Sequence, residues 1–407
     1  MKILITTDTF YPMINGVAIS TDNLYKELKK LGHDVRVLTL SHTKKDRVED
    51  DIYYLKAFKV NVYPDARVAN LIIGDIEKSM IEWKPDVVHS QTEFSTLIMA
   101  RYIIKKTGAL HLHTYHTMYE EYVKYLFKGK LIRPKMVGRL TQLVFYKMDG
   151  IVVPTEKMKE NLIKSKIQKP LYVVPTGLDI GKFQKRISQE DKRDLINKYG
   201  LEGKKLLVYV GRLGQEKNIE EIIVNFTKME YKQNNIKLMI VGGGPYLSTL
   251  KDLVSNLNIN DSVIFTGMIH PDEIYKYYQL GHIFVSASTS ETQGLTYIEA
   301  LASGVPVICR EDPCVKGLII DGYNGYTFED EEEFSSTVLK FITNEPHRIE
   351  AIKGAELKAQ EYSREIFGKK IISIYEELKL CNKKADKPTQ LNKIFRVLKK
   401  FSRSSEI

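Results

Sequence analysis

Cysteine is scarce in this chain, and its spacing excludes the usual cysteine-based architectures. The 407 residues include three cysteines, Cys309, Cys314 and Cys381. Three thiols cannot build the disulfide framework of a small secreted protein, and no Cys-x-x-Cys pair points to a zinc site. We therefore expect inert thiols and a reducing compartment such as the cytoplasm.

Long apolar runs and targeting signals are also missing. No stretch reaches the roughly 18 uninterrupted apolar residues that a membrane-spanning helix needs. The opening MKILITTDTF holds an apolar run that Asp8 interrupts, and this run is too short for a secretory signal peptide. No Gly-x-Gly-x-x-Gly follows it, which disfavours a Rossmann-type dehydrogenase.

The composition is that of a soluble globular protein. Hydrophobic residues make up 43% of the chain and charged residues 28%, which excludes collagen-like, disordered and coiled-coil classes. The length exceeds what one hydrophobic core usually supports, so two domains are expected.

Short runs rich in Val, Ile and Leu alternate with longer stretches of helical periodicity, and the pattern restarts after a charged stretch at 181–204. This alternation predicts the α/β class, with two Rossmann-like, doubly wound parallel sheets. The predicted divisions are 1–177, 178–360, a C-terminal helix at 361–380 that can cross back to the first domain, and a tail at 381–407. The predicted strands lie at 2–6, 34–40, 86–90, 110–116 and 150–155, and then at 205–211, 237–244, 262–268, 282–288 and 306–310.

The net charge of +10 is concentrated in two segments. Residues 118–147 hold seven basic and two acidic residues among several aromatic ones, and the tail from 382 holds eight basic and two acidic residues. On a helical wheel, residues 391–403 separate into an apolar face and a cationic face, as in helices that lie in an anionic membrane interface. The alternatives are a docked or disordered tail and an ordinary amphipathic helix pair at 118–147. Nucleic acid is disfavoured because no recognition motif accompanies the charge.

Three loops follow predicted strands and carry polar residues suited to an anionic ligand. Gly16 lies between the first strand and a helix, where backbone N–H groups can approach an anion. Arg212 and Lys217 follow the first strand of the second half, at the edge where open α/β sheets bind ligands and where two cations can hold a diphosphate. The run Gly242–Gly244 is interpreted as a tight connection, with a ligand-facing turn as the alternative.

The third loop is the most informative. Glu291 follows the strand HIFVSAS, and Glu299 lies eight positions later, about two helical turns into the next helix. Such carboxylates can accept hydrogen bonds from sugar hydroxyls. Gln293, Gly294 and Leu295 offer backbone N–H groups at the helix N-terminus, where a phosphate is stabilised.

Together these motifs resemble those of the retaining glycosyltransferases of family four, over residues 1–380. The resemblance implies the GT-B fold, in which two Rossmann-like domains face each other across a cleft. It implies that Glu291 binds hydroxyls of the transferred sugar, Glu299 binds the nucleotide ribose, and the cations neutralise the leaving diphosphate. It also places the base against the Met268 backbone and His116 in the sugar pocket. The implied catalytic set is Glu291, His116, Arg212 and Lys217, and the implied donor-binding set adds Gly16, Met268, Gln293, Gly294, Leu295 and Glu299.

The histidines at 89–116 do not indicate a metal. His111 and His113 alternate on a predicted strand and share one face, but no acidic ligand accompanies them in the sequence. No Asp-x-Asp motif is present either. We therefore expect no metal cofactor, with Arg212 and Lys217 supplying the positive charge at the diphosphate.

Two details are similar to bacterial glucosyltransferases that act on diacylglycerol. These are Gln293, where an aromatic residue is more common, and the segment 114–122. The resemblance implies UDP-glucose as donor, diacylglycerol as acceptor, and a cytoplasmic enzyme held at the inner face of the cell membrane through 118–147 and 391–403. The alternatives are another nucleotide sugar with a polyprenyl-linked or soluble glycan acceptor, or a non-catalytic nucleotide-sugar-binding protein at the membrane.

Overall fold

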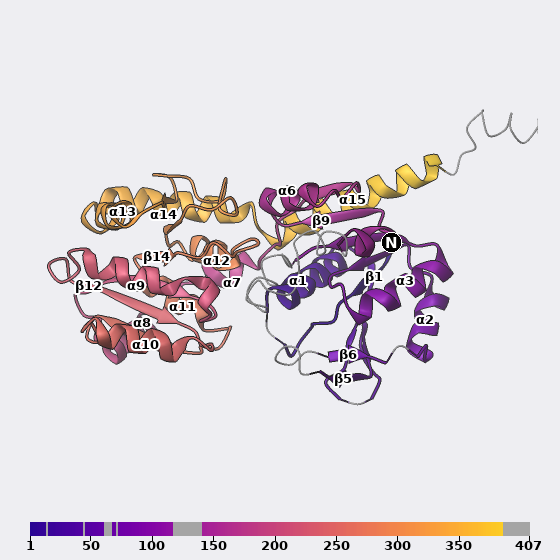
Figure 1. Ribbon diagram of the computed structural model, residues 1–407, viewed down its shortest axis with the longest axis horizontal. Helices are drawn as coiled ribbons and strands as arrows, with labels where there is room; N and C mark the ends of the chain where they lie inside the picture. The colour runs from indigo at the N-terminus through magenta and orange to yellow at the C-terminus, as the bar shows by residue number, and fades with distance from the viewer. Residues whose placement is uncertain (14, 44, 61–66, 71, 117–140, 386–407) are drawn as a thin grey trace, which may run out of the picture.

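Two separate β-sheets, one mostly and one wholly parallel, are each covered by helices and form the body of the protein (Figure 1). The computed structural model describes residues 1–13, 15–43, 45–60, 67–70, 72–116 and 141–385. The predicted tail segment 391–403 lies outside the described residues, as does the predicted segment 118–147 apart from 141–147. The predicted architecture of two doubly wound α/β sheets is confirmed.

The first sheet runs in the order β10-β9-β8-β7-β1-β2-β4-β3. Its pairings are parallel except for β3 against β4. The central strand is buried on both sides, and Ile3 pairs with Val35 on one neighbour and Val87 on the other. The strands are β1 (Lys2–Thr6), β2 (Asp34–Leu40), β3 (Arg47–Glu49), β4 (Ile52–Leu55), β7 (Val87–Ser90), β8 (Leu110–Thr114), β9 (Gly150–Val153) and β10 (Leu171–Val173).

Helices cover both faces of this sheet, and a hairpin beside it forms a separate two-stranded sheet. The helices are α1 (Gly16–Lys30), α2 (Asp75–Trp83), α3 (Ser95–Thr107) and α6 (Glu156–Lys164), and the antiparallel hairpin is β5 (Ala57–Lys59) with β6 (Arg67–Ala69). The short strands β3 to β6 and β10 were not predicted. They span only three or four residues each, which is too short for a clear alternation of apolar and polar side chains.

The second sheet runs in the order β13-β12-β11-β14-β15-β16 and is parallel throughout. Five of its strands match predicted runs, and β16 is an additional edge strand. They are β11 (Lys205–Val210), β12 (Ile236–Val241), β13 (Val263–Gly267), β14 (Ile283–Ser286), β15 (Val307–Arg310) and β16 (Gly325–Phe328).

Two apolar clusters, one on each face of the second sheet, hold its helices in place. The edge of this sheet where the strands end carries the short η1 (Gln215–Lys217) and the start of α12 (Leu295–Ala302). The other helices are α7 (Ile180–Gln184), α8 (Gln189–Tyr199), α9 (Ile219–Lys228), α10 (Leu247–Asn256), α11 (Ile274–Leu280), α13 (Glu331–Thr343) and α14 (Glu345–Gln360).

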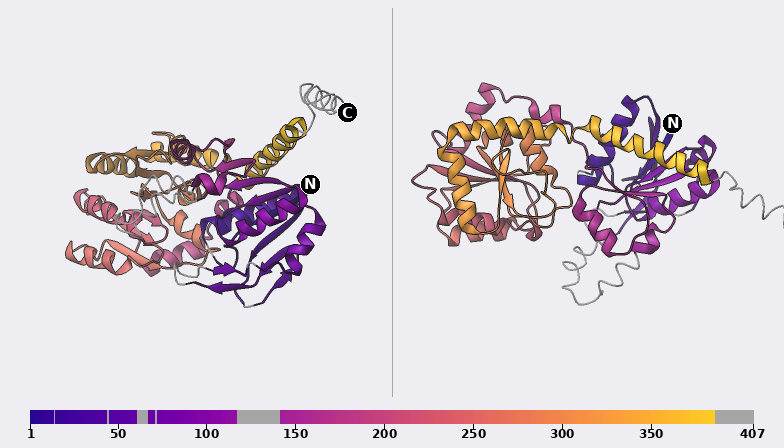
Figure 2. Two further views of the ribbon diagram at one scale, coloured as in Figure 1. Left: turned by 45° about the vertical axis from the view of Figure 1, so that its right-hand side comes forward. Right: turned by 90° about the horizontal axis from the view of Figure 1, so that it is seen from above.

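The chain crosses between the domains twice. After α14, the helix α15 (Arg364–Ala385) returns to the first domain and lies along it (Figure 2). Its residues Phe367, Ile371 and Tyr375 belong to the apolar cluster of the first sheet. The two crossings touch, because Leu178 N donates to Tyr362 O at 2.8 Å and Arg364 N donates to Leu178 O at 2.9 Å.

The helices and the cysteines of the described residues can be set against the sequence-based expectations. None of their helices combines the length and apolar character that crossing a membrane requires. All three cysteines are free thiols, with Cys309 and Cys314 buried and Cys381 exposed. Burial raises the pKa of the two interior thiols, which keeps them protonated.

Candidate active site

The strand-end edge of the second sheet brings together the cation and the carboxylate that the motifs singled out. Lys217 ends the short helix after β11, and Glu291 lies in the loop after β14. The two strands are adjacent, and Lys217 Nζ lies 2.6 Å from Glu291 Oε1. Both side chains are about one-fifth exposed, at 20% and 19%. This ion pair therefore stays open to a ligand above the sheet edge.

Arg212 lies in the same loop but is directed to a different partner. Its guanidinium pairs with Glu216 one helical turn later, and its side chain is 46% exposed. The pairing leaves Arg212 at the surface of the loop. A phosphate that approaches this edge would compete with the Glu216 carboxylate for the same N–H donors.

The glycine run after β12 supports the Arg212 loop from behind. A methyl group added to Gly242 would lie 2.0 Å from the carbonyl oxygen of Gly211, and one on Gly244 would lie 2.3 Å from that of Leu213. The backbone contact is closed by Leu213 N, which donates to Gly243 O at 2.9 Å. The run is therefore a tight connection, as interpreted from the sequence, because only glycine permits the two loops to approach so closely.

The N-termini of two helices from different domains converge near this edge. α1 begins at Gly16 and is capped by Asn15, whose side chain accepts a hydrogen bond from Ala18 N at 2.9 Å. α12 begins at Leu295, and a methyl group on Gly16 would lie 3.7 Å from Leu295 Cδ1. Both N-termini carry positive partial charge, so together they favour an anion placed between them.

The two residues just before α12 are fixed by a left-handed backbone conformation at Gly294 and by side-chain hydrogen bonds of Gln293. Gly294 has a φ of +73°, and a side chain there would meet the Tyr297 ring at 2.4 Å. Gln293 is buried, and its side chain forms two hydrogen bonds with the backbone of the interdomain linker. Gln293 Oε1 accepts from Thr176 N at 2.8 Å, and Gln293 Nε2 donates to Thr176 O at 2.9 Å. The Gln293 side chain therefore ties α12 to the linker, a role that the sequence did not indicate.

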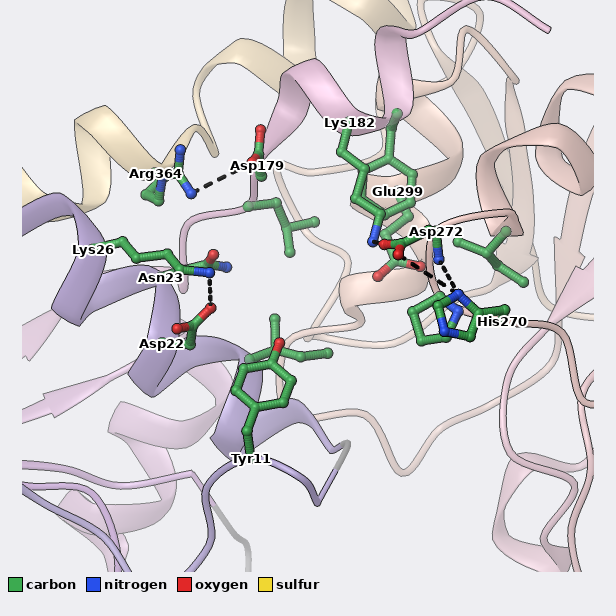
Figure 3. Close-up of a pocket in the computed structure, with 15 residues that line it drawn as sticks. Tyr11, Asp22, Asn23, Lys26, Asp179, Lys182, His270, Asp272, Glu299 and Arg364 are labelled. Atoms are coloured by element: carbon green, nitrogen blue, oxygen red, sulfur yellow. Dashed lines mark hydrogen bonds and ion pairs between the residues drawn. The ribbon is translucent and has the colours of Figure 1, made fainter. Parts of the chain in front are cut away.

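Glu299 lines a cavity of about 350 Å³ between the two domains (Figure 3). Tyr278 OH donates to Glu299 Oε2 at 2.8 Å. Loss of hydration on burial raises the pKa of Glu299 to about 7, against the lowering effects of Tyr278 and Lys182. The opposite wall comes from α1 and the preceding turn, with Tyr11, Asp22 and Lys26.

The charged side chains around the cavity are of both signs, and several of them form ion pairs. Lys182 Nζ lies 2.9 Å from Asp272 Oδ1, and Arg364 lies 3.4 Å from Asp179 at the interdomain crossing. Met268 lies beside Gly243 and is 79% exposed, so its backbone and side chain are accessible from solvent. Met268 directly follows β13, so a nucleotide base bound beside it would lie at the strand-end edge of the second sheet.

His116 belongs to the first domain and is held by Gln91. His116 Nε2 donates to Gln91 Oε1 at 2.8 Å, which leaves Nδ1 as the acceptor of a neutral ring. Burial, reinforced by His113, lowers the pKa of His116 to about 3. The other end of the buried Gln91 amide, Nε2, has no hydrogen-bond partner among the described residues.

The neighbouring histidines form a buried polar network. Ser90 Oγ lies 2.9 Å from His111 Nε2 and 2.8 Å from His113 Nδ1, so the two histidines share one face as predicted. His113 Nε2 also lies 3.1 Å from Glu93. Glu93 reaches His113 from the loop after the adjacent strand, a contact that the sequence did not indicate. Within the described ranges, no group of three or more His, Cys, Asp or Glu side chains is arranged to hold a metal ion.

The chain is similar to known proteins over most of its length. Residues 14–182 match the family described as Glycosyltransferase Family 4, and residues 191–358 match Glycosyl transferases group 1. The alpha-monoglucosyldiacylglycerol synthase of Streptococcus pneumoniae is 37% identical over 94% of this chain and 87% of its own length. The enzyme of the same name from Acholeplasma laidlawii is 29% identical over 93% of this chain and 97% of its own.

The chain is a family 4 glycosyltransferase. Solved structures agree on its fold. The Anabaena HepE protein in complex with UDP superposes with a TM-score of 0.72 at 14% identity, over 93% of this chain and 100% of the other. The sucrose-phosphate synthase of Thermosynechococcus elongatus superposes with a TM-score of 0.71 at 18% identity, over 93% and 99% of the two chains. The predicted GT-B fold is confirmed.

Within this glycosyltransferase, the sequence motifs form two groups. Glu291, Lys217, Gly294, Leu295 and Gly16 gather where the strand ends of the second sheet face α1, whereas Glu299 lies farther along α12 in the cavity. Their assigned roles stay predictions.

Sequence reasoning missed Gln91, Thr176 and a cross-domain pair formed by Lys157 and Asp312. The only available signal for Gln91 was its position directly after a buried strand.

Proposed function

We propose that this glycosyltransferase transfers glucose from UDP-glucose to diacylglycerol in a membrane and retains the anomeric configuration. The names of the relatives from Streptococcus pneumoniae and Acholeplasma laidlawii support glucose and diacylglycerol, since both are alpha-monoglucosyldiacylglycerol synthases. The observation that carries the proposal is the Lys217–Glu291 ion pair beside the converging N-termini of α1 and α12.

The geometry suits a nucleoside diphosphate leaving group. In the proposed complex the diphosphate lies between Lys217, Arg212 and the N–H groups at the starts of α1 and α12. These groups stabilise the negative charge that develops as the bond between the sugar and the phosphate breaks. Arg212 and Lys217 thereby provide the positive charge, without a metal cofactor.

The carboxylates then orient the donor. Glu291 accepts hydrogen bonds from hydroxyls of the glucose, and Lys217 holds its carboxylate in place. Glu299 accepts from the ribose, next to the base at Met268. Neutral His116 offers its Nδ1 lone pair to a hydroxyl in the sugar pocket, on the side of the first domain.

The acceptor hydroxyl attacks from the same face as the departing diphosphate. A phosphate oxygen of that diphosphate takes the proton from the acceptor, so no side chain is assigned as a general base. The protein contributes positioning and charge stabilisation. The acceptor stays in the bilayer, and we propose a cytoplasmic enzyme bound to the inner face of the cell membrane through 118–147 and 391–403.

A single incubation tests the donor, the acceptor and the reaction class. The full-length protein is incubated with UDP-glucose and vesicles of diacylglycerol mixed with anionic phospholipid, and the lipids are examined by mass spectrometry. Hexosyl-diacylglycerol that α-glucosidase cleaves is the expected product, and Glu291→Gln should abolish it. Product with UDP-galactose or GDP-mannose only would refute the donor, and product with soluble glycans only would refute the acceptor.

A further inference from the structure

A lysine from the first domain holds the loop that carries Glu291. Lys157 lies in the first turn of α6, and its ammonium reaches into the second domain. Lys157 Nζ lies 3.0 Å from each carboxylate oxygen of Asp312. It also donates to the backbone carbonyls of Thr289 at 2.8 Å and of Glu291 at 3.4 Å. One ammonium therefore contacts the backbone carbonyls on both sides of Ser290, one of which belongs to Glu291 itself.

Further hydrogen bonds hold the Glu291 loop and the Asp312 carboxylate in place. Thr155, the N-cap of α6, donates to Thr292 O at 2.9 Å. Asp312 Oδ1 accepts from Cys314 N at 2.7 Å, which fixes the carboxylate after β15. The Lys157 and Asp312 side chains are only 13% and 9% exposed. Three carbonyls of the Glu291 loop, at positions 289, 291 and 292, thus have donors from the first domain.

The stability of α6 does not explain why a lysine occupies position 157. A cation in the first turn of a helix lies at the positive end of the helix dipole, which is unfavourable. Removing two charges from water is also unfavourable unless the geometry is good and the remaining hydrogen-bonding positions are filled. Here the three N–H donors of the ammonium are met by two carbonyls and a carboxylate, all from the second domain.

We propose that Lys157, paired with Asp312, is a positioning residue for transfer that sets the place of Glu291 and makes it depend on the approach of the two domains. This proposal rests on the proposed role of Glu291 as the residue that holds the transferred sugar. When the domains separate, Lys157 and Thr155 withdraw and the three carbonyls lose their donors. When the domains approach, the loop is fixed at the moment the first domain completes the sugar pocket. Closure and alignment of Glu291 are thereby one event.

Four variants separate positioning from general stability. Lys157→Met removes the ammonium and keeps the length of the side chain, but it leaves the Asp312 charge buried and unpaired. The double variant Lys157→Met with Asp312→Asn removes that unpaired charge. Lys157→Arg keeps the positive charge. Lys159→Met is the matched control, because Lys159 lies on the same helix and, among the described residues, forms its ion pair with Glu156, an exposed neighbour.

We expect Lys157→Met to lower kcat by about 10- to 100-fold, as displacement of a reacting group by about 1 Å does. UDP affinity, measured by calorimetry, should change by less than about threefold, a difference of under about 0.7 kcal/mol. The double variant should regain the thermal midpoint of the wild type without regaining kcat. Lys157→Arg should recover part of kcat, and Lys159→Met should behave like the wild type.

Hydrogen–deuterium exchange provides a readout that does not require activity. Lys157→Met should speed exchange of the backbone at 288–294 in the UDP-bound protein, relative to Lys159→Met. Unchanged exchange there would overturn the proposal, and so would a double variant that regains kcat together with the thermal midpoint. A wild-type protein without glucosyl transfer would refute the proposed function alone, because the exchange result stands independently of it.

Discussion

The raised pKa of Glu299 makes a quantitative prediction about stability and pH. Burial at the cavity shifts this carboxyl from its ordinary value of 4.5 to about 7. Between these two pH values the folded protein keeps a proton that the unfolded chain has lost. The free energy of unfolding therefore falls as the pH rises through this window, and the loss is complete once the pH exceeds about 7. Glu299→Gln removes the titration and keeps an acceptor for the Tyr278 hydroxyl.

The magnitude follows from the shift. One pKa unit corresponds to about 1.4 kcal/mol, so Glu299 accounts for a decrease of at most about 2.5 kcal/mol between pH 5 and 8. Water that enters the cavity lessens this figure, because part of the side chain is accessible there. Glu299→Gln should therefore gain stability over the wild type as the pH rises, by about 1 to 2.5 kcal/mol at pH 8 relative to pH 5. Tyr278→Phe should steepen the dependence, because the hydroxyl that stabilises the carboxylate is lost.

Guanidinium denaturation at a series of pH values measures this difference. Circular dichroism follows the whole protein, while fluorescence of the single tryptophan, Trp83, follows the first domain. Glu299 lies in the second domain, so the Trp83 transition serves as an internal control wherever the domains unfold separately. Equal pH dependence in wild type and Glu299→Gln would refute the reasoning, since Glu299 would then be ionised and hydrated in the folded protein. In the wild type, UDP affinity should also rise between pH 6 and 8, as a carboxylate becomes available to the ribose.

Four further predictions test other parts of the protein. Lys217→Ala should lower kcat by about 100-fold or more, as loss of a charge-stabilising donor does, and a normal rate would remove Lys217 from the site. Gln293→Met leaves Thr176 N and O buried without partners, so the thermal midpoint should fall by an amount equivalent to about 2 to 4 kcal/mol, and an unchanged midpoint would mean that water replaces the side chain. Gly294→Ala meets the Tyr297 ring at 2.4 Å and should weaken UDP binding in calorimetry. Ser303→Ala should not, because it removes a buried hydroxyl that has no hydrogen-bond partner in the described part of the chain. Vesicle binding should weaken as salt rises, because screening shortens electrostatic attraction to about 10 Å at 0.1 M, and salt-independent binding would point to apolar insertion.

Local sequence determined the elements of this protein and their class. Buried strands such as Lys2–Thr6 and Val307–Arg310 are visible as continuous apolar runs, and helix ends are marked by Gly32 and by caps such as Asn15. Arg212, Lys217 and Glu291 stood out because they follow strands at the edge where parallel sheets bind ligands. Glu299 stood out because it lies eight positions after Glu291, in the next helix. Such signals lie within a few residues of each other, so one sequence is enough to detect them.

The tertiary structure decided which of these residues meet and what surrounds them. Lys157 and Asp312 lie 155 positions apart, and His89 and Tyr375 lie 286 positions apart, so no local pattern could pair them. The burial that shifts the pKa of Glu299 comes from residues of both domains around one cavity. Strand and helix formation depends on neighbours along the chain, whereas desolvation, ion pairing and the approach of α1 to α12 depend on how two separately formed domains pack together.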